Sequence, residues 1–148
     1  MPLVFLSASH RASRQIGIHL AGQMAPLGLQ NPEAHLLSFL RSYSPTAISE
    51  LRRVFGLRKS TLTSLLDRLE RRGLLARSVH PTDRRSWLVS LTEEGRRAAD
   101  LVQRPVEELE EGIRAAITDE ELHGFHRVLA AIAEVTRVRV RSDTKENP

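Results

Sequence analysis

The sequence predicts a mainly α-helical protein with one small β-hairpin, and three observations lead to this fold class. Apolar residues recur at helical spacing along most of the chain, whereas the stretch from Leu75 to Leu91 alternates with a period of two. Aromatic residues make up only 4% of the 148 residues, so the core must be aliphatic, which suits packed helices. The sequence contains no cysteine, which excludes disulfides and thiolate metal sites within it.

Basic residues are concentrated in the middle of the chain. Residues 46–97 contain twelve Lys and Arg and six Asp and Glu, whereas the other residues contain ten and twelve. This distribution suggests a polyanion-binding module, although a solvated charged surface would have the same composition. No apolar run reaches the roughly 20 residues that span a bilayer, and the apolar start is too short for a secretion signal. A soluble cytoplasmic protein is therefore expected.

The first third of the chain predicts three helices. The first covers about residues 6–27. The second begins with Asn31 as its N-cap and reaches about residue 41. The third is short, covering residues 47–55, and Gly56 closes it at the C′ position.

The clearest helix covers residues 59–72. Leucines at positions 62, 65, 66 and 69 form one apolar stripe along it, and the opposite face carries hydroxyl and charged side chains. Only a short turn containing Gly56 separates this helix from the preceding one. Two helices joined in this way form a helix-turn-helix.

A β-hairpin follows the helix-turn-helix. Residues 75–79 and 87–91 alternate, and the turn between them is rich in positive charge, so the hairpin has the size of a wing. Trp87 is expected to pack this wing against the body of the protein. The predicted fold is therefore a winged helix-turn-helix with additional helices at both ends.

Two helices are predicted after the hairpin. Thr92 caps a long helix that continues past Pro105, and Thr118 forms a capping box with Glu121 at the start of the last helix. The apolar faces of these helices are wider than a small winged helix can cover. This excess implies a partner, most simply a second copy of the chain.

Five blocks of this sequence resemble the multiple-antibiotic-resistance regulator (MarR) family in their order and spacing. They are Thr46–Leu51, Lys59–Thr63, Leu66–Leu75, Asp83–Arg85 and Leu91–Gly95. The resemblance implies a homodimeric transcriptional regulator, usually a repressor, that binds a pseudo-palindromic double-stranded DNA operator. It also implies release by a small aromatic or phenolic effector, and no cofactor is expected.

The expected domain organisation follows from these elements and from the resemblance. It consists of an N-terminal dimerisation helix in residues 1–30, a winged helix-turn-helix DNA-binding domain in residues 31–92, C-terminal dimerisation helices in residues 93–141 and a disordered tail in residues 142–148.

The helix after the turn is expected to enter the major groove, which is about 12 Å wide and admits one α-helix. The predicted DNA contacts on this helix are Arg58, Lys59, Ser60, Thr61, Thr63, Ser64 and Arg68. Arg58 or Lys59 suits guanine, and the hydroxyls suit phosphates or thymine methyl groups. The alternative is that Ser60 and Thr61 only cap the helix while Arg58 is solvated.

The wing tip carries a second set of predicted DNA contacts. Asp83 and Arg85 lie on the same side of an extended chain, so Asp83 is expected to hold the guanidinium of Arg85 ready for the narrow minor groove. Arg84 would then point to a phosphate. The alternative is a turn aspartate beside two solvated arginines.

The other arginines of this region leave two interpretations open. Arg68, Arg71, Arg72 and Arg77 suit phosphate contacts. Pairing of Asp67 with Arg71 at i,i+4 on the same helix is equally compatible with the sequence.

Other residues support weaker hypotheses. Arg14 and His35 are suggested as ligand-binding residues, in the cleft that the family resemblance places between the dimerisation helices and the winged domain. No metal site is expected, because a helical pair such as His123 and His126 without thiolates usually belongs to the surface or core.

Two other classes of function compete with DNA binding. An enzyme is not expected, because the sequence has no glycine-rich phosphate loop, cysteine nucleophile or helical His-Glu metal motif. A winged helix kept as a protein-binding or dimerisation module without DNA affinity remains the alternative, but it would need neither Arg84 and Arg85 nor the basic middle of the chain.

Overall fold

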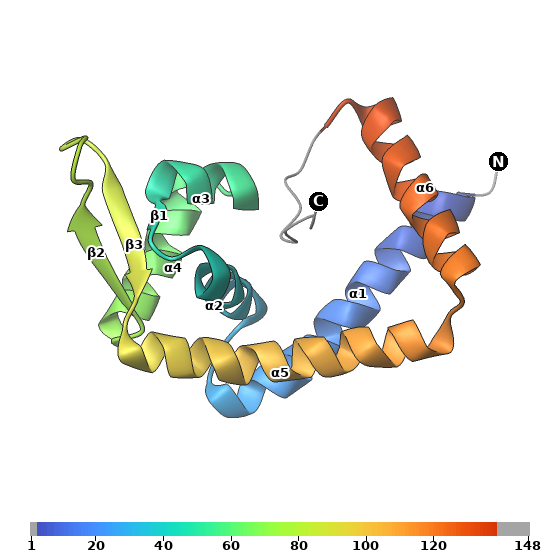
Figure 1. The fold of residues 1–148 in the computed structure, drawn as a ribbon, viewed down its shortest axis with the longest axis horizontal. Helices are drawn as coiled ribbons and strands as arrows, with labels where there is room; N and C mark the ends of the chain where they lie inside the picture. The colour runs from blue at the N-terminus through green and yellow to red at the C-terminus, as the bar shows by residue number, and fades with distance from the viewer. Residues whose placement is uncertain (1–2, 139–148) are drawn as a thin grey trace. The chain divides into compact units, whose positions relative to one another are not determined.

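The computed structural model describes residues 3–138, which divide between Val106 and Glu107 into two compact units. Each unit is described by itself. Helix α5 (Glu93–Ala116) contributes its first half to one unit and its second half to the other. The predicted fold class, mainly helical with a small β wing, is confirmed (Figure 1).

The first unit contains the helix-turn-helix and the wing (Figure 1). Its elements in chain order are α1 (Val4–Met24), the short 3-10 helix η1 (Ala25–Leu27), α2 (Asn31–Tyr43), β1 (Thr46–Ala47), α3 (Ile48–Phe55), α4 (Lys59–Arg71), β2 (Leu75–Val79), β3 (Trp87–Leu91) and the first half of α5.

The three strands form one antiparallel sheet in the order β1-β3-β2. The predicted hairpin is confirmed, with Leu75 opposite Leu91 at its base and Val79 opposite Trp87 near its tip. Strand β1 was not predicted. It has two residues, too few for an alternating pattern, and pairs with β3 through Thr46 and Val89.

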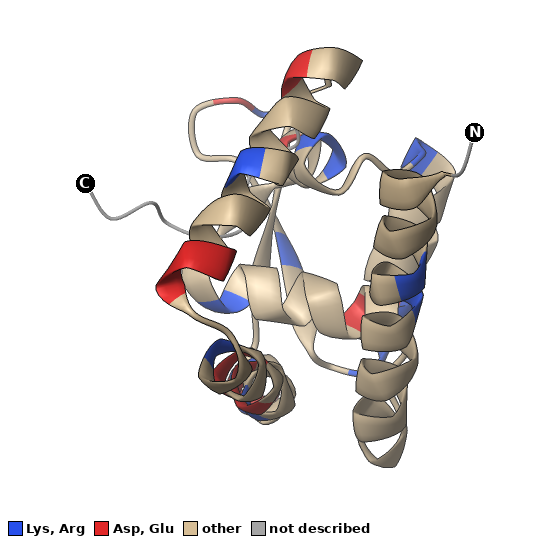
Figure 2. Cartoon of the chain, turned by 90° about the vertical axis from the view of Figure 1, so that its right-hand side faces the viewer, with Lys and Arg blue, Asp and Glu red and all other residues tan. Residues whose placement is uncertain are grey.

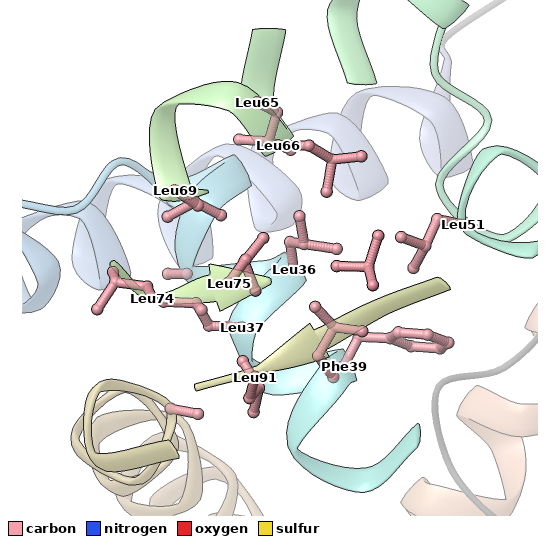
Figure 3. Packing of buried hydrophobic residues seen from close by; sticks show 14 of the residues in the cluster. Leu36, Leu37, Phe39, Leu51, Leu65, Leu66, Leu69, Leu74, Leu75 and Leu91 are labelled. Atoms are coloured by element: carbon pink, nitrogen blue, oxygen red, sulfur yellow. The ribbon is translucent and has the colours of Figure 1, made fainter. Parts of the chain in front are cut away.

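The core of this unit consists mainly of leucines, as the low aromatic content predicts. All four leucines of the α4 stripe are buried. They pack with buried residues of the neighbouring helices and strands, including Leu36, Leu37, Leu51, Leu75 and Leu91 (Figure 3). Since one face of α4 is fixed by this packing, its opposite face remains at the surface.

The predicted caps at Gly56 and Thr92 are confirmed, whereas the predicted N-cap at Asn31 is wrong. The first helix ends at Met24, where a short 3-10 helix follows it, instead of at about residue 27, and the second extends to Tyr43. Gly56 adopts a left-handed conformation, with φ of 60°, where α3 ends, and the Thr92 hydroxyl accepts a hydrogen bond from Gly95 N at 3.0 Å where α5 begins. Asn31 is not the N-cap of α2, because Gln30 precedes the first turn. The Asn31 side chain instead donates to Gly17 O of α1 at 2.8 Å.

The second unit consists of the last part of α5 and α6 (Asp119–Thr136). The predicted capping box is confirmed: Thr118 N donates to Glu121 Oε2 at 2.8 Å, and Glu121 N donates to the Thr118 hydroxyl at 3.2 Å. No residue of α6 is buried in the chain. The tail predicted in residues 142–148 lies outside the described residues.

None of the helices described between residues 3 and 138 combines the length and the hydrophobicity that a membrane crossing requires.

Candidate nucleic-acid interface

The turn between α3 and α4 presents the start of α4 at the surface. Arg58 occupies the N-cap position in an extended conformation, and its side chain makes no capping hydrogen bond. No acidic residue lies in the first turn of α4, while Arg58 and Lys59 flank it. The positive end of the helix dipole and two cationic side chains therefore meet here, which favours an anionic partner.

The residues predicted to face the major groove, at the N-cap and in the first turns of α4, are all exposed, and they form the polar rim of α4. The polar rim consists of Arg58, Lys59, Ser60, Thr61, Thr63 and Ser64, whereas Leu62 between them is buried. Within residues 3–138 the Ser60 and Thr61 hydroxyls make no hydrogen bond, so they do not cap the helix in this structure. The Thr63 hydroxyl donates to Lys59 O at 2.8 Å, which leaves its lone pairs and methyl group available to a partner.

The wing turn is held by backbone and side-chain hydrogen bonds. Ser86 N donates to Asp83 O and His80 N donates to Ser86 O, both at 2.9 Å. The Asp83 carboxylate accepts from Arg85 N at 3.0 Å and from the Ser86 hydroxyl. The expectation that Asp83 holds the guanidinium of Arg85 is therefore wrong here, because the carboxylate bonds the backbone of the turn instead.

The side chains of Arg84 and Arg85 lie at the exposed tip of this turn. Neither guanidinium has an acidic partner among the described residues. A fixed turn with two unneutralised cations at its tip is suited to an extended polyanion.

Hydrogen bonds from the Ser86 hydroxyl and from the Arg85 backbone lower the pKa of Asp83 below its ordinary value. Ionised Asp83 therefore stabilises the folded turn at neutral pH. This contribution is present above the ordinary carboxyl pKa of about 3.9 and is lost as the pH falls through the lower pKa of the folded turn.

We expect the amide resonances of Arg85 and Ser86 to titrate at a lower pH than in a peptide with the same turn sequence. An acid titration followed by NMR measures both, and Asp83→Asn should abolish the transition. A transition at or above the pH of the peptide would contradict this role of Asp83.

Arg77, for which a phosphate contact was one interpretation, pairs with acidic residues of its own domain. Its guanidinium pairs with Asp67 and lies 3.1 Å from Glu70 Oε2, so it joins β2 to α4. The pairing of Asp67 with Arg71, one of the two interpretations left open by the sequence, does not occur, since the Asp67 carboxylate is occupied by Arg77. Arg71 Nε donates only to the Asp67 backbone carbonyl, at 3.3 Å.

Arg68 and Arg72 lie at the C-terminal end of α4, where Arg68 contacts the first turn of α2 and Arg72 contacts the loop before it. Arg68 Nε lies 3.1 Å from Glu33 Oε1, and Arg72 Nη1 donates to Gly28 O at 2.7 Å. Both arginines are therefore engaged with neighbouring elements, unlike the exposed residues at the start of α4.

Trp87 was expected to pack the wing against the body, and this expectation is wrong. Its side chain is 47% exposed and lies opposite Val79, which is 48% exposed. Arg52 is exposed in the last turn of α3, the first helix of the motif, and is a further candidate that was not predicted from the sequence. Since the first helix of such motifs crosses the DNA backbone, a basic residue in its last turn is the signal that would have identified it.

The two residues suggested for ligand binding both lie in the first unit. Arg14 is exposed on α1, and His35 is exposed on α2. The His35 ring meets the edge of Phe55 at 4.9 Å between ring centroids, and Phe39 stacks on Tyr43 beside them at 4.6 Å. Within residues 3–138 no three His, Asp or Glu side chains are arranged to hold a metal ion.

The similarity to known proteins covers this interface and the helices around it. Residues 29–87 match the profile of the MarR family. YcgE of Bacillus subtilis (strain 168), an uncharacterised HTH-type transcriptional regulator, is 32% identical over 124 residues, which cover 83% of this chain and 79% of YcgE.

Two solved structures show the same fold. MepR of S. aureus, in a complex with DNA, has a TM-score of 0.81 at 18% identity, covering 88% of this chain and 97% of MepR. A mutant MarR of E. coli, in a complex with operator DNA, has a TM-score of 0.77 at 23% identity, covering 88% of this chain and 94% of MarR. With a fold, a sequence profile and a relative in agreement, the resemblance found in the sequence is confirmed, and the chain belongs to the MarR family of helix-turn-helix transcriptional regulators.

Proposed function

We propose that this regulator binds double-stranded DNA in a sequence-specific manner, as a homodimer on a pseudo-palindromic operator, and represses transcription there. The observation that carries the proposal is the pairing, within one compact unit, of an exposed polar rim on α4 with a wing tipped by Arg84 and Arg85. The function is one of binding, without a catalytic step. Because a regulator works where the DNA is held, we place it in the bacterial cytoplasm.

The start of α4 is proposed to read the major groove. Arg58 and Lys59 provide the long cationic side chains that suit guanine O6 and N7. Ser60, Thr61, Thr63 and Ser64 are short enough for the helix to approach the bases closely, and their hydroxyl and methyl groups suit phosphates and thymine.

The wing is proposed to contact the adjacent minor groove. A narrow minor groove has an enhanced negative potential that attracts arginine. The hydrogen bonds of Asp83 fix the turn before DNA is bound, so Arg84 and Arg85 are presented on an ordered tip. Asp83 thus supports the contact through the backbone of the turn.

A second copy of the chain is proposed to cover the apolar faces of the terminal helices. On α6 the exposed apolar residues recur at helical spacing, at Phe125, Val128, Leu129, Ile132 and Val135. Apart from its acidic first turn, α6 carries only two charged residues (Figure 2, the diagonal helix in front). α1 exposes a similar set, including Phe5, Ile16 and Ile18. Apolar faces of this extent are typical of an obligate interface.

A small aromatic or phenolic effector is proposed to release the DNA, with Arg14 and His35 as its binding residues. Arg14 offers an exposed cation for a carboxylate or phenolate, and His35 borders the cluster of Phe39, Tyr43 and Phe55. Displacement of bound duplex by aromatic acids tests this part of the proposal.

Binding to duplexes selected from a random pool tests the proposed function. The affinity should fall steeply with salt, by about 0.9 log units per log unit of salt for each phosphate neutralised. Arg85→Ala should reduce this slope and weaken binding most where the flanks of the site are rich in A·T pairs, because the narrow groove is lost as a contact.

Arg127→Ala on α6 is the matched control, since it removes an exposed arginine from the second unit and should leave the salt slope unchanged. Binding that does not depend on salt, or an Arg85→Ala variant that binds like the parent, would contradict DNA recognition. Such a result would favour a protein-binding winged helix.

A further inference from the structure

Arg68 of α4 and Arg72, the C-cap residue of α4, contact residues 27–33. This segment, called the connector, runs from the last residue of η1 through the loop into the first turn of α2. Arg72 Nη1 donates to Gly28 O at 2.7 Å, and Arg72 Nη2 donates to Leu27 O at 3.2 Å. One turn earlier, Arg68 Nε lies 3.1 Å from Glu33 Oε1. Both arginines therefore bind one segment from the same side of α4.

Glu33 is the anchor of this arrangement. The residue is only 5% exposed, and both of its carboxylate oxygens are occupied: Oε2 accepts from Gln30 N at 2.9 Å and Oε1 accepts from Arg68. It also lies in the first turn of α2, where the helix dipole favours a negative charge. A buried carboxylate requires such partners, because an unpaired charge in this position is strongly destabilising.

The connector is fixed from the other side by α1. The Asn31 side chain donates to Gly17 O at 2.8 Å. The first turn of α2 thus contacts α1 through Asn31 and α4 through Glu33. It joins a proposed dimerisation helix to the helix proposed to read the DNA.

We propose that Arg68 and Arg72 are positioning residues that fix α4 relative to α1, and that Arg68 is not a DNA contact. In the dimer this link sets the separation of the two α4 helices and hence the preferred spacing of the half-sites. Arg68 contacts Glu33 through Nε, and loss of that contact would leave the buried Oε1 atom of Glu33 without its partner. The inference rests on the proposed function and deepens it.

Two single variants and their combination separate positioning from DNA contact. Arg68→Ala removes the cation. Glu33→Gln replaces one of the two accepting oxygens with an NH2 group, which cannot accept from Gln30 N or from Arg68. Arg71→Ala is the matched control, because this neighbouring arginine contacts only its own helix.

Binding of selected duplexes is the first measurement. If Arg68 acts through Glu33, each single variant should bind about tenfold more weakly, and the double variant should be no weaker than either. The salt slope should stay at the value of the parent protein. A slope reduced by about 0.9 in Arg68→Ala, with parental affinity in Glu33→Gln, would overturn the proposal, because it would identify Arg68 as a phosphate contact.

Half-site spacing is the readout that a purely stabilising contact would not change. Inserting one base pair between the half-sites moves them apart by about 3.4 Å. The parent protein and Arg71→Ala should bind this longer duplex more weakly. In Glu33→Gln and Arg68→Ala the penalty should become smaller, since α4 is held less firmly. An unchanged penalty in both variants would contradict the positioning role.

Amide hydrogen exchange of the free protein tests the positioning role without DNA, and its result therefore does not depend on the proposed function. The amides of residues 28–31, 33 and 34 should exchange about tenfold faster in Glu33→Gln and Arg68→Ala than in Arg71→Ala. Equal exchange in all three variants would overturn the link between α4 and the connector. If the parent protein selects no duplex, the proposed function fails, and the exchange result still decides whether Arg68 holds the connector.

Discussion

Gly95→Ala is expected to destabilise the winged-helix unit by about 3 kcal/mol or more. Gly95 is buried at the start of α5, and a Cβ atom there would lie 1.9 Å from Leu74 O and 2.9 Å from Leu74 C. These are backbone atoms, and Leu74 O also accepts from Thr92 N at 3.1 Å, so neither partner can move away independently. The clash between the added Cβ atom and the Leu74 carbonyl group can be relieved only if α5 shifts away from the base of the wing.

Thermal or urea unfolding measures this effect, and a melting temperature lower by roughly 6–12 °C is expected. Gly112→Ala in the same helix is the control, because a Cβ atom there meets no atom within 4 Å. That variant should be neutral or more stable by up to about 1 kcal/mol, since alanine favours helix more than glycine does. Equal losses in both variants would show that helix propensity, and not the contact with Leu74, governs the result.

The combined variant Leu129→Glu and Ile132→Glu is expected to be a monomer that binds the operator about 100-fold more weakly or worse. In the single chain these two side chains are 46% and 40% exposed on the apolar face of α6, so the substitutions bury no charge within the protomer. In a dimer they would place four carboxylates in an apolar interface. Two linked winged helices bind neighbouring half-sites far more tightly than two separate ones, which is why DNA affinity should fall with the dimer.

Sedimentation at micromolar concentration should then give only the 16.6 kDa species. Ala130→Glu is the control, because this residue lies on the opposite, polar side of α6 and should leave both the dimer and DNA binding intact. A variant that is monomeric but binds the full operator like the parent would contradict the proposed dimer on DNA. A variant that remains dimeric would place the interface elsewhere.

Features that depend on residues a few positions apart could be predicted from the sequence. The leucine stripe of α4, the left-handed Gly56 and the caps formed by Thr92 and Thr118 all occur as expected. Each arises from helical periodicity or from one hydrogen bond within a single turn. The exposed polar residues at the start of α4 could be predicted for the same reason, because burial of the leucine face leaves the opposite face of the helix exposed.

Partners of the charged side chains could not be predicted in the same way. Asp67 has Arg71 one turn away in sequence, yet it pairs with Arg77, because the chain reverses after α4 and β2 packs against it. Asp83 is two residues from Arg85, but the backbone N–H of Arg85 is closer than its flexible guanidinium. In both cases the spacing in the sequence identifies a possible partner, but the folded chain brings a different hydrogen-bond donor closer to the carboxylate.

The sequence of this protein was therefore sufficient for its helices, its wing and its family, since all of these rest on short-range patterns. Folding was needed to bring residues far apart in the chain together: it pairs the two residues of β1 with β3, exposes Trp87 and places Arg68 on Glu33. Such contacts have no signature in spacing or composition. They exist because packing of the leucine core sets which polar side chains meet at its edge, and that packing is a property of the whole unit.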